Sequence, residues 1–452
     1  ELFCQDSSTA YSSAMVGTAS TAYKRAVIAD RIARLRILAE SAARFRNLLP
    51  PGQLHLKWVG GRLGATICDQ EIVVTTDPRP TLLESFASLP DPRVQRTQRH
   101  KLIDIVAIAI LGMTSGADTW VDIAEFGRSK EPWLRQFLEL PNGIPSHDTF
   151  GRVFARLDPE QFRSCFLDWI RTVQALTHGQ VIAIDGKTLR RSHDRVAGHE
   201  AIHMVSAWAT ANHLVLGQVQ TNAKSNEITA IPKLLRLLDL SGCIVTIDAM
   251  GCQRDIALQI QQQQGDYVLA VKENQQGLYD RIQWLFERAE RADYAQVESH
   301  DACKTVEKGH GRIEIRRCWV ISDATYALYA QSVRFWAGIN SLIKVVSVRR
   351  VGDTVSSETR YYISSLSGNA RQMLRVIRSH WAIENELHWC LDVAFLEDDS
   401  RVRKDHAPEN LAILRHLCLS LLKQEHSAKC GLKAKRLRAA WDTAYLLKVL
   451  DV

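Results

Sequence analysis

The sequence lacks an apolar run long enough to cross a membrane. The best candidate in its 452 residues is LIDIVAIAILGM, from Leu102 to Met113. It is shorter than the roughly 20 residues of a spanning helix, and it contains Asp104. This stretch is typical of a buried helix in a soluble protein. We therefore expect no membrane partner and a cytoplasmic location.

Disulfide and zinc patterns are also missing. The ten cysteines include no CxxC pair and no Cys/His cluster at zinc spacing. This pattern favours reduced thiols in a cytosol over a disulfide framework or a structural zinc ion.

A complete phosphate-binding loop is absent as well. The stretch VIAIDGKTLRRS, at 181–192, contains GKT, but a Walker A loop needs a glycine five positions before its GK, and Val181 occupies that position. No GxGxxG turn follows the strand-like VIAIDG either. We therefore predict no nucleotide cofactor, and Asp185 becomes the residue of interest in this stretch.

The charge balance is basic, with a net charge of +7 and an isoelectric point near 8.9. It tilts the interpretation toward an anionic partner, although many basic proteins bind no nucleic acid.

Periodicity divides the chain into four parts. Helical spacing dominates after Pro80, strands alternate with helices from Val181, and a strand-rich stretch precedes a return to helix. The predicted parts are a poorly organised N-terminal extension at 1–80, a helical domain at 81–176, an α/β domain at 177–425 with a β-rich insertion at about 290–367, and a basic helical tail at 426–452. We expect the helical domain to bind DNA, although spacing alone leaves open whether it reads DNA or is a packing module.

The order of elements in the α/β domain indicates its fold. Three strands come first, in VIAIDG, AIHMVSAWAT and HLVLGQVQT, and a helix, a strand, a helix and a strand follow. This is the order of an RNase H-like fold, whereas a dinucleotide-binding fold begins strand–helix–strand.

Two aspartates end equivalent strands in this order. Asp185 closes VIAID and Asp248 closes IVTID, on strands predicted to be neighbours. Two carboxylates so placed repel each other unless a cation lies between them, and their oxygens suit Mg²⁺ or Mn²⁺. Taken alone, each is more commonly a turn former or helix cap.

A downstream helix, RVIRSHWAIENELHWCLDV, offers a third acid. Glu384, His388 and Asp392 are spaced four apart, so they are expected on one helix face, with His380 one turn earlier. Glu384 could complete a cation site, while Arg378, His380 and His388 approach phosphates. The alternative is an ordinary solvated face, and a zinc site is disfavoured because HxxxE is not HExxH.

At this point the chain resembles a known family. Its IDGKTLRRS, HMVSAW, KSNEITAIP, TIDAMGCQ, DYVLAVKENQ, KGHGRIEIRR, RYYISSL and HWAIENELHWCLDVAF are similar to motifs of bacterial insertion-sequence transposases of the DDE class, including the H-repeat-associated proteins of Rhs elements. The resemblance covers roughly residues 81–425, with the motifs in the family's order.

The resemblance implies an RNase H-like catalytic core with a β-rich insertion and metal-dependent cleavage and strand transfer at the ends of an insertion sequence. The implied catalytic and metal-binding triad is Asp185, Asp248 and Glu384, holding Mg²⁺ or Mn²⁺, with two ions expected. The implied partners are element-end and target DNA, with a homodimer in the DNA complex and location at the bacterial nucleoid.

The chain departs from the YxxRxxxExxxxxxK pattern of a wider group of such transposases. The matching positions are Ile377, His380, Glu384 and Leu391, so only the Glu is retained and His380 is expected in place of the Arg.

Further DNA contacts are expected from basic residues near the triad and in the insertion: Lys187, Arg190, Arg191, Lys224, Lys272, Arg312, Arg316 and Arg317. Each could instead be a solvated surface charge. Two rival functions stay open, a metal-dependent nuclease of the same fold and an inactive DNA-binding relic of a mobile element.

Overall fold

The structure is a computed structural model that describes residues 82–450, apart from 174–178, 194–199, 222–226, 310 and 332–335, and the backbone of three strands between residues 54 and 72. The chain divides into two compact units, Glu1–Arg79 and Pro80–Val452.

The first unit contains a small antiparallel sheet that we did not expect. Its strands are β1 (Leu54–Val59), β2 (Arg62–Ile67) and β3 (Gln70–Ile72), in that order. The signal was present in the sequence, because the first two strands are separated by Gly60 and Gly61, a typical hairpin connection. The amphipathic pattern at 20–49 lies outside the described residues.

The second unit is built on a nine-stranded sheet with the order β6-β5-β4-β7-β8-β12-β11-β10-β9. The strands are β4 (Val181–Thr188), β5 (His203–Ala209), β6 (Leu214–Thr221), β7 (Ile244–Ile247), β8 (Asp266–Val271), β9 (His300–Gly309), β10 (Arg312–Ile321), β11 (Ser341–Val351) and β12 (Thr354–Ser364). Strands β4, β7 and β8 are parallel, and every other pairing is antiparallel. The β-rich stretch therefore continues the central sheet, because β12 pairs with β8.

Helices cover both faces of this sheet. On one face lie α7 (Glu227–Leu235), α8 (Arg254–Gln262), α9 (Gln276–Arg291) and α10 (Ala324–Ala330). The other face carries α11 (Ala370–Ala382), which contacts β4, β7, β8, β10 and β9. Residues along β7 alternate between the two sides, since Ile244 packs in the cluster with α11 and Val245 in the cluster with α7 and α8.

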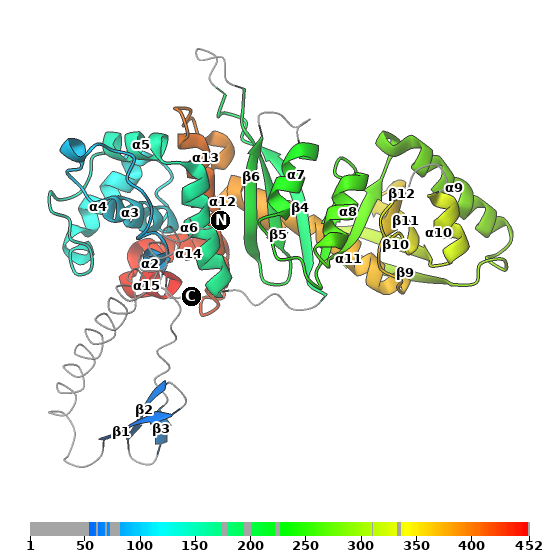
Figure 1. Ribbon diagram of the computed structural model, residues 1–452, viewed down its shortest axis with the longest axis horizontal. Coiled ribbons are helices and arrows are strands. Elements are labelled where there is room, and N and C mark those ends of the chain that lie inside the picture. The colour runs from blue at the N-terminus through cyan, green and yellow to red at the C-terminus, as the bar shows by residue number, and fades with distance from the viewer. Residues whose placement is uncertain are drawn as a thin grey trace, which may run out of the picture. The chain divides into compact units, whose positions relative to one another are not determined.

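The remaining helices gather beyond β6, at the opposite end of the sheet from β9 (Figure 1). They are α2 (Leu82–Ser85), α3 (Leu102–Thr114), α4 (Trp120–Leu134), α5 (His147–Arg156), α6 (Pro159–Val173), α13 (Ala407–Gln424), α14 (Leu432–Trp441) and α15 (Thr443–Leu450), with a short 3-10 turn at Gln95–Thr97. Ser146 caps α5 by accepting a hydrogen bond from the Thr149 N–H.

Helix α13 holds this layer together. It is buried on almost every side and contacts α3, α5, α6 and β6. Its Asn410 donates to the Phe154 and Leu157 carbonyls at the end of α5. Helices from before the central sheet (α3, α5 and α6) and from after it (α13 and α14) therefore share one core. The predicted domain boundaries at residues 176 and 426 separate helices that pack together. Along the described part of the chain, no helix is long and apolar enough to span a membrane.

Replacing Asn410 by Ala should destabilise the protein by about 1–3 kcal/mol, because two buried carbonyls lose their donor. Urea denaturation would measure this loss. Asn142→Ala removes an exposed amide that donates to the Arg99 carbonyl and should change the free energy of unfolding much less. Equal effects of the two changes would contradict this assignment.

Candidate active site at the ends of β4 and β7

The register of two parallel strands brings Asp185 and Asp248 to the same level. Ile184 pairs with Ile247, the last such pair between β4 and β7, and each aspartate is the next residue. Adjacent strands lie about 4.8 Å apart, so the two carboxyl groups start from neighbouring backbone positions. The two strands are neighbours, as predicted, but Asp185 does not end β4, which continues to Thr188 in antiparallel pairing with β5. Asp248 also accepts hydrogen bonds from the Met250 and Gly251 N–H groups through one oxygen.

Glu384 reaches the same region from an unexpected element. Helix α11 continues into a π-helical segment, Ile383–His388, and then into α12 (Trp389–Phe395). Ile383 and Leu387 are fully buried, whereas Glu384 is exposed. Insertions of π-helix within α-helices occur frequently at functional sites.

The π-helical segment and α12 lie beside Asp248, Asp185 and Lys187. Glu384 shares a cavity with Asp248, His388 lies near Asp185, and Asp392 contacts Lys187. Glu384, His388 and Asp392, which are four residues apart, therefore each approach a different residue of the sheet and do not meet at one point.

Two adjoining cavities open beside Asp248. The first, of about 160 Å³, contains Asp248, Glu384, His380, Lys272, Arg360 and Trp381 in its lining. The second, of about 520 Å³, shares Asp248, Lys272 and Arg360 with the first and extends past Asn274 and Tyr279. Arg360 stacks over the Trp381 ring at 5.1 Å and is held by both oxygens of Glu358. Sequence reasoning missed Arg360, although it begins the quoted RYYISSL.

The carboxyl groups are electrostatically coupled. Burial raises the pKa of Asp185 to about 7, and the charges of Asp248, Glu227 and Glu384 add to the rise. Burial and the charge of Glu227 likewise raise the pKa of Asp248, and Lys272 opposes them. This excess of negative charge is what a bound cation would relieve.

The two histidines of this region are neutral. Burial lowers the pKa of His380 to about 4, and its Nδ1 lies 3.2 Å from the Thr246 hydroxyl oxygen. Burial and the charge of Lys187 lower the pKa of His388 to about 3. Its Nδ1 is 3.7 Å from an Asp185 oxygen, so this is neither an ion pair nor a hydrogen bond.

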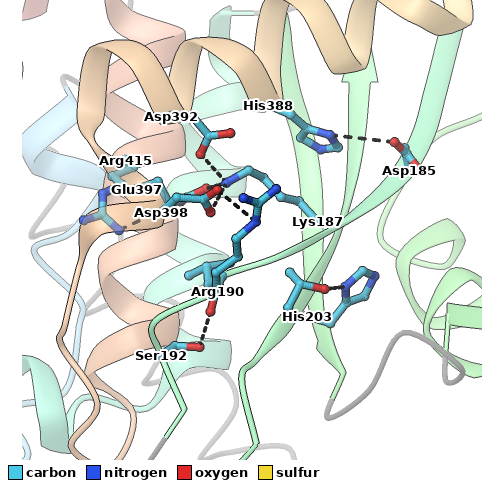
Figure 2. Close-up of polar contacts among 12 residues, drawn as sticks. Asp185, Lys187, Arg190, Ser192, His203, His388, Asp392, Glu397, Asp398 and Arg415 are labelled. Carbon is cyan, nitrogen blue, oxygen red and sulfur yellow. Dashed lines mark hydrogen bonds and ion pairs between the residues drawn. The ribbon is translucent and has the colours of Figure 1, made fainter.

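Lys187 lies in an ion-pair cluster, which differs from its expected role as a phosphate contact. Figure 2 shows it directed at Asp392, Glu397 and Asp398, with distances of 2.6, 2.9 and 3.2 Å from its Nζ atom. Its side chain is only 12% exposed. Burial opposes its charge, but Glu397 and Asp392 raise its pKa to about 12. Lys187 therefore ties β4 to the segment that follows α12.

The other predicted DNA contacts fall into several settings. Arg190 and Arg191 pair with Asp398 and Asp399, but both remain exposed, so such pairs compete weakly with a phosphate. In the insertion, Arg312 and Arg316 pair with Glu314, and Arg378 of α11 pairs with Glu307 on β9.

Arg317 is exposed, and Lys272 lines both cavities. Lys224 lies outside the described residues.

The donor set fits a hard cation in its chemistry, but the present arrangement is not a closed metal site. Across the described residues, no three His, Cys, Asp or Glu side chains are grouped closely enough to hold a metal ion. Asp185, Asp248 and Glu384 provide carboxylate oxygens, the ligands preferred by Mg²⁺. Glu384 is exposed, so its side chain has room to change rotamer toward the aspartates.

Comparisons with known proteins place the chain in a family. The sequence model described as "Transposase DDE domain" matches residues 177–421, and the model described as "DDE_Tnp_1-associated" matches 83–170. The chain belongs to the DDE transposase family. The motifs also indicated a similarity to H-repeat-associated proteins, and one of these is 42% identical to this chain.

Two relatives of this transposase-family chain come from Escherichia coli K12. They are "H repeat-associated putative transposase YhhI" and "Putative protein YbfL", each 42% identical over 373 residues, which is 82% of this chain and 97% of the relative. Among solved structures, the chain is similar to a piggyBac transposase synaptic complex with hairpin DNA, with a TM-score of 0.38, 11% identity, and coverage of 80% of this chain and 76% of the other.

Lys187→Met should destabilise the transposase-family chain by about 3 kcal/mol or more, because it leaves buried carboxylates without their cation. Thermal and urea unfolding would measure the loss. Arg190→Met, at a side chain that is 79% exposed, should cost less than about 1 kcal/mol. If Lys187→Met left stability unchanged and weakened only DNA binding, Lys187 would be a phosphate contact after all.

Asp185→Asn should stabilise the metal-free protein at pH 8. The folded-state pKa of about 7 lies above the ordinary 3.8, so the folded chain binds a proton that the unfolded chain lacks between these values. The free energy of unfolding therefore falls as the pH rises through that window. The uncharged amide of Asp185→Asn does not titrate, so at pH 8 the variant should be more stable than the wild type by at least about 1 kcal/mol. Melting curves in EDTA at pH 4 and pH 8 test this. A gain equal at both pH values would contradict it.

Proposed function

We propose that this chain is a transposase that cuts and joins DNA at the ends of its own insertion sequence, with Asp185, Asp248 and Glu384 as the catalytic carboxylates. The observation that carries the proposal is that these three acids, from β4, the end of β7 and the π-helical segment, lie in one region, next to a cavity that Lys272 and Arg360 help to line.

The topology supports an RNase H-like core. Strands β4, β5 and β6 form an antiparallel meander, and β7 and β8 add on the other side of β4 in parallel. The sheet order β6-β5-β4-β7-β8 places β7 beside β4, the one neighbour relation that the order of elements predicted. In open α/β sheets, ligands bind beyond the carboxyl ends of parallel strands. Both aspartates come directly after the last parallel pair of β4 and β7.

The three carboxylates would hold two Mg²⁺ ions, which would activate a water or 3′-hydroxyl nucleophile and stabilise the leaving oxygen of the phosphodiester. The chain's own groups would bind and orient the DNA. Lys272 and Arg360 line both cavities and would bind the phosphates on either side of the cut. Trp381, 41% exposed beside Glu384, offers a surface on which a base can stack.

Phosphodiester cleavage and joining need neither ATP nor a covalent protein intermediate, since each phosphate bond that breaks is exchanged for one that forms. We propose that a homodimer binds both element ends, so that the two cuts occur in one complex.

The test is cleavage of DNA carrying the element's terminal sequence, with Mg²⁺, with Mn²⁺ and with EDTA. The intact protein should nick this DNA only when a metal ion is present, and Asp185→Ala, Asp248→Ala and Glu384→Ala should each reduce the rate by at least about 10³-fold, the scale expected when a major electrostatic contribution is lost.

The products separate the rival functions. Joined products indicate a transposase, and cleavage without joining indicates a nuclease. DNA binding with no cleavage by any of the four proteins would contradict the proposal and leave a DNA-binding relic. If Glu384→Ala alone still cut the DNA, the third carboxylate would be wrongly assigned.

Arg360→Ala should weaken binding of element-end DNA about tenfold and reduce its salt dependence, because a phosphate contact is lost. Fluorescence anisotropy at several salt concentrations measures both. Arg350→Ala is the control, because Arg350 lies on β11 and donates to the nearby Gly352 carbonyl. Equal affinities for the two variants would show that Arg360 does not contact the DNA.

A further inference from the structure

Glu227 is a buried carboxylate that the proposed reaction does not yet use. It is the first residue of α7, directly after the segment that follows β6, and is only 3% exposed. Its Oε1 lies 2.7 Å from Nε2 of His203, and Nδ1 of His203 lies 2.8 Å from the Thr188 hydroxyl oxygen. Figure 2 shows His203 on the strand beside β4. A hydroxyl, an imidazole and a carboxylate are thus linked in a row.

Gly186 makes room for this pair beside the first aspartate. A Cβ atom at Gly186 would overlap His203 Nε2 and lie 2.6 Å from Glu227 Oε1. Asp185 and Lys187 flank Gly186 and lie near His388 and Asp392, whereas a Cβ atom at Gly186 would be directed at His203 and at Glu227 of α7. The glycine of the GKT stretch therefore serves close packing of an acid against β4.

The charge of Glu227 reaches both aspartates. It is the strongest charged contributor to the raised pKa of Asp248 and follows Asp248 among the charges that raise the pKa of Asp185. Glu384 ranks after it at Asp185. Glu227 thus adds unfavourable negative charge at both aspartates, and it lies against Gly186, next to Asp185 on β4.

We propose that Glu227 is a positioning residue of the candidate cation site, a fourth carboxylate whose charge increases the affinity of the three acids for a divalent cation. Thr188 and His203 orient it. This inference rests on the proposed function, because it assumes that Asp185, Asp248 and Glu384 hold the cation.

A purely structural role explains Glu227 poorly. Burying a carboxylate costs free energy, and doing so near two other carboxylates costs more. A glutamine could accept the same hydrogen bond from His203 and fill the same space without that cost. The charge becomes favourable only when a cation binds, which is how outer carboxylates tune metal sites.

Mn²⁺ binding to the full chain without DNA tests the proposal, followed by electron paramagnetic resonance of the free ion. Glu227→Gln keeps the shape and removes the charge, so it should weaken Mn²⁺ binding by about tenfold or more. Glu227→Asp keeps the charge and should retain more affinity than the Gln variant. Thr188→Val should cause a smaller loss, because the carboxylate stays and only its orientation is relaxed.

The control is Glu314→Gln, which removes the same charge from β10, where Glu314 pairs with Arg312 and Arg316. It should bind Mn²⁺ like the wild type. Melting curves in EDTA give a second readout, in which Glu227→Gln should be at least as stable as the wild type.

The outcomes separate this inference from the proposed function. If Asp185→Asn lost Mn²⁺ and Glu227→Gln did not, Glu227 would have no role in cation binding, while the three-acid site would stand. If the Asp variant bound Mn²⁺ less well than the Gln variant, shape and not charge would matter, and the inference would fail. If the wild type bound no Mn²⁺, both would fail.

Discussion

The in-register pairing of β4 with β7 is the constraint on which this structure depends. It sets Asp185 and Asp248 side by side at the end of a buried parallel sheet, where burial and mutual repulsion disfavour their charged forms. The charged neighbours that act most on Asp185 are themselves carboxylates. A fold that maintains such an arrangement stores unfavourable electrostatic energy that a bound cation can release, which links the strand register to the metal-dependent reaction that we propose.

The surrounding elements hold this arrangement in place. Helix α11 packs across the sheet and delivers Glu384 through the π-helical segment, and the Lys187 ion-pair cluster fastens β4 to the chain that follows α12. Lys187 and Asp185 lie two residues apart on one strand. The same strand therefore carries a compensated set of charges, which contributes stability, and an uncompensated set, which we assign to catalysis. Gly186, between them, leaves room for Glu227 on the opposite side.

Much of the candidate site could be predicted because its signals are local. The strand-end aspartates, the order of elements from VIAIDG to DYVLAVK and the acid of the HWAIEN helix are each read from a few neighbouring residues. The partners of Lys187 could not be predicted, because Asp392 and Glu397 lie some 200 residues away in the sequence and are brought near by tertiary packing. Glu227 was missed for the same reason, and a π-helical register has no clear sequence signature. In the fold, the Gly60–Gly61 pair between β1 and β2 was a local hairpin signal that we missed. The pairing of β12 with β8 and the central position of α13 are long-range features, which periodicity does not encode.

The central claim is that the three acids form one cation site, and crystals grown with Mn²⁺ test it most directly. Anomalous diffraction at the manganese edge locates the ions without reference to activity. The account predicts anomalous peaks within about 2.5 Å of carboxylate oxygens of Asp185, Asp248 and Glu384, a typical metal–oxygen distance. Peaks bound only by other residues, or none at this sheet edge at millimolar Mn²⁺, would contradict it.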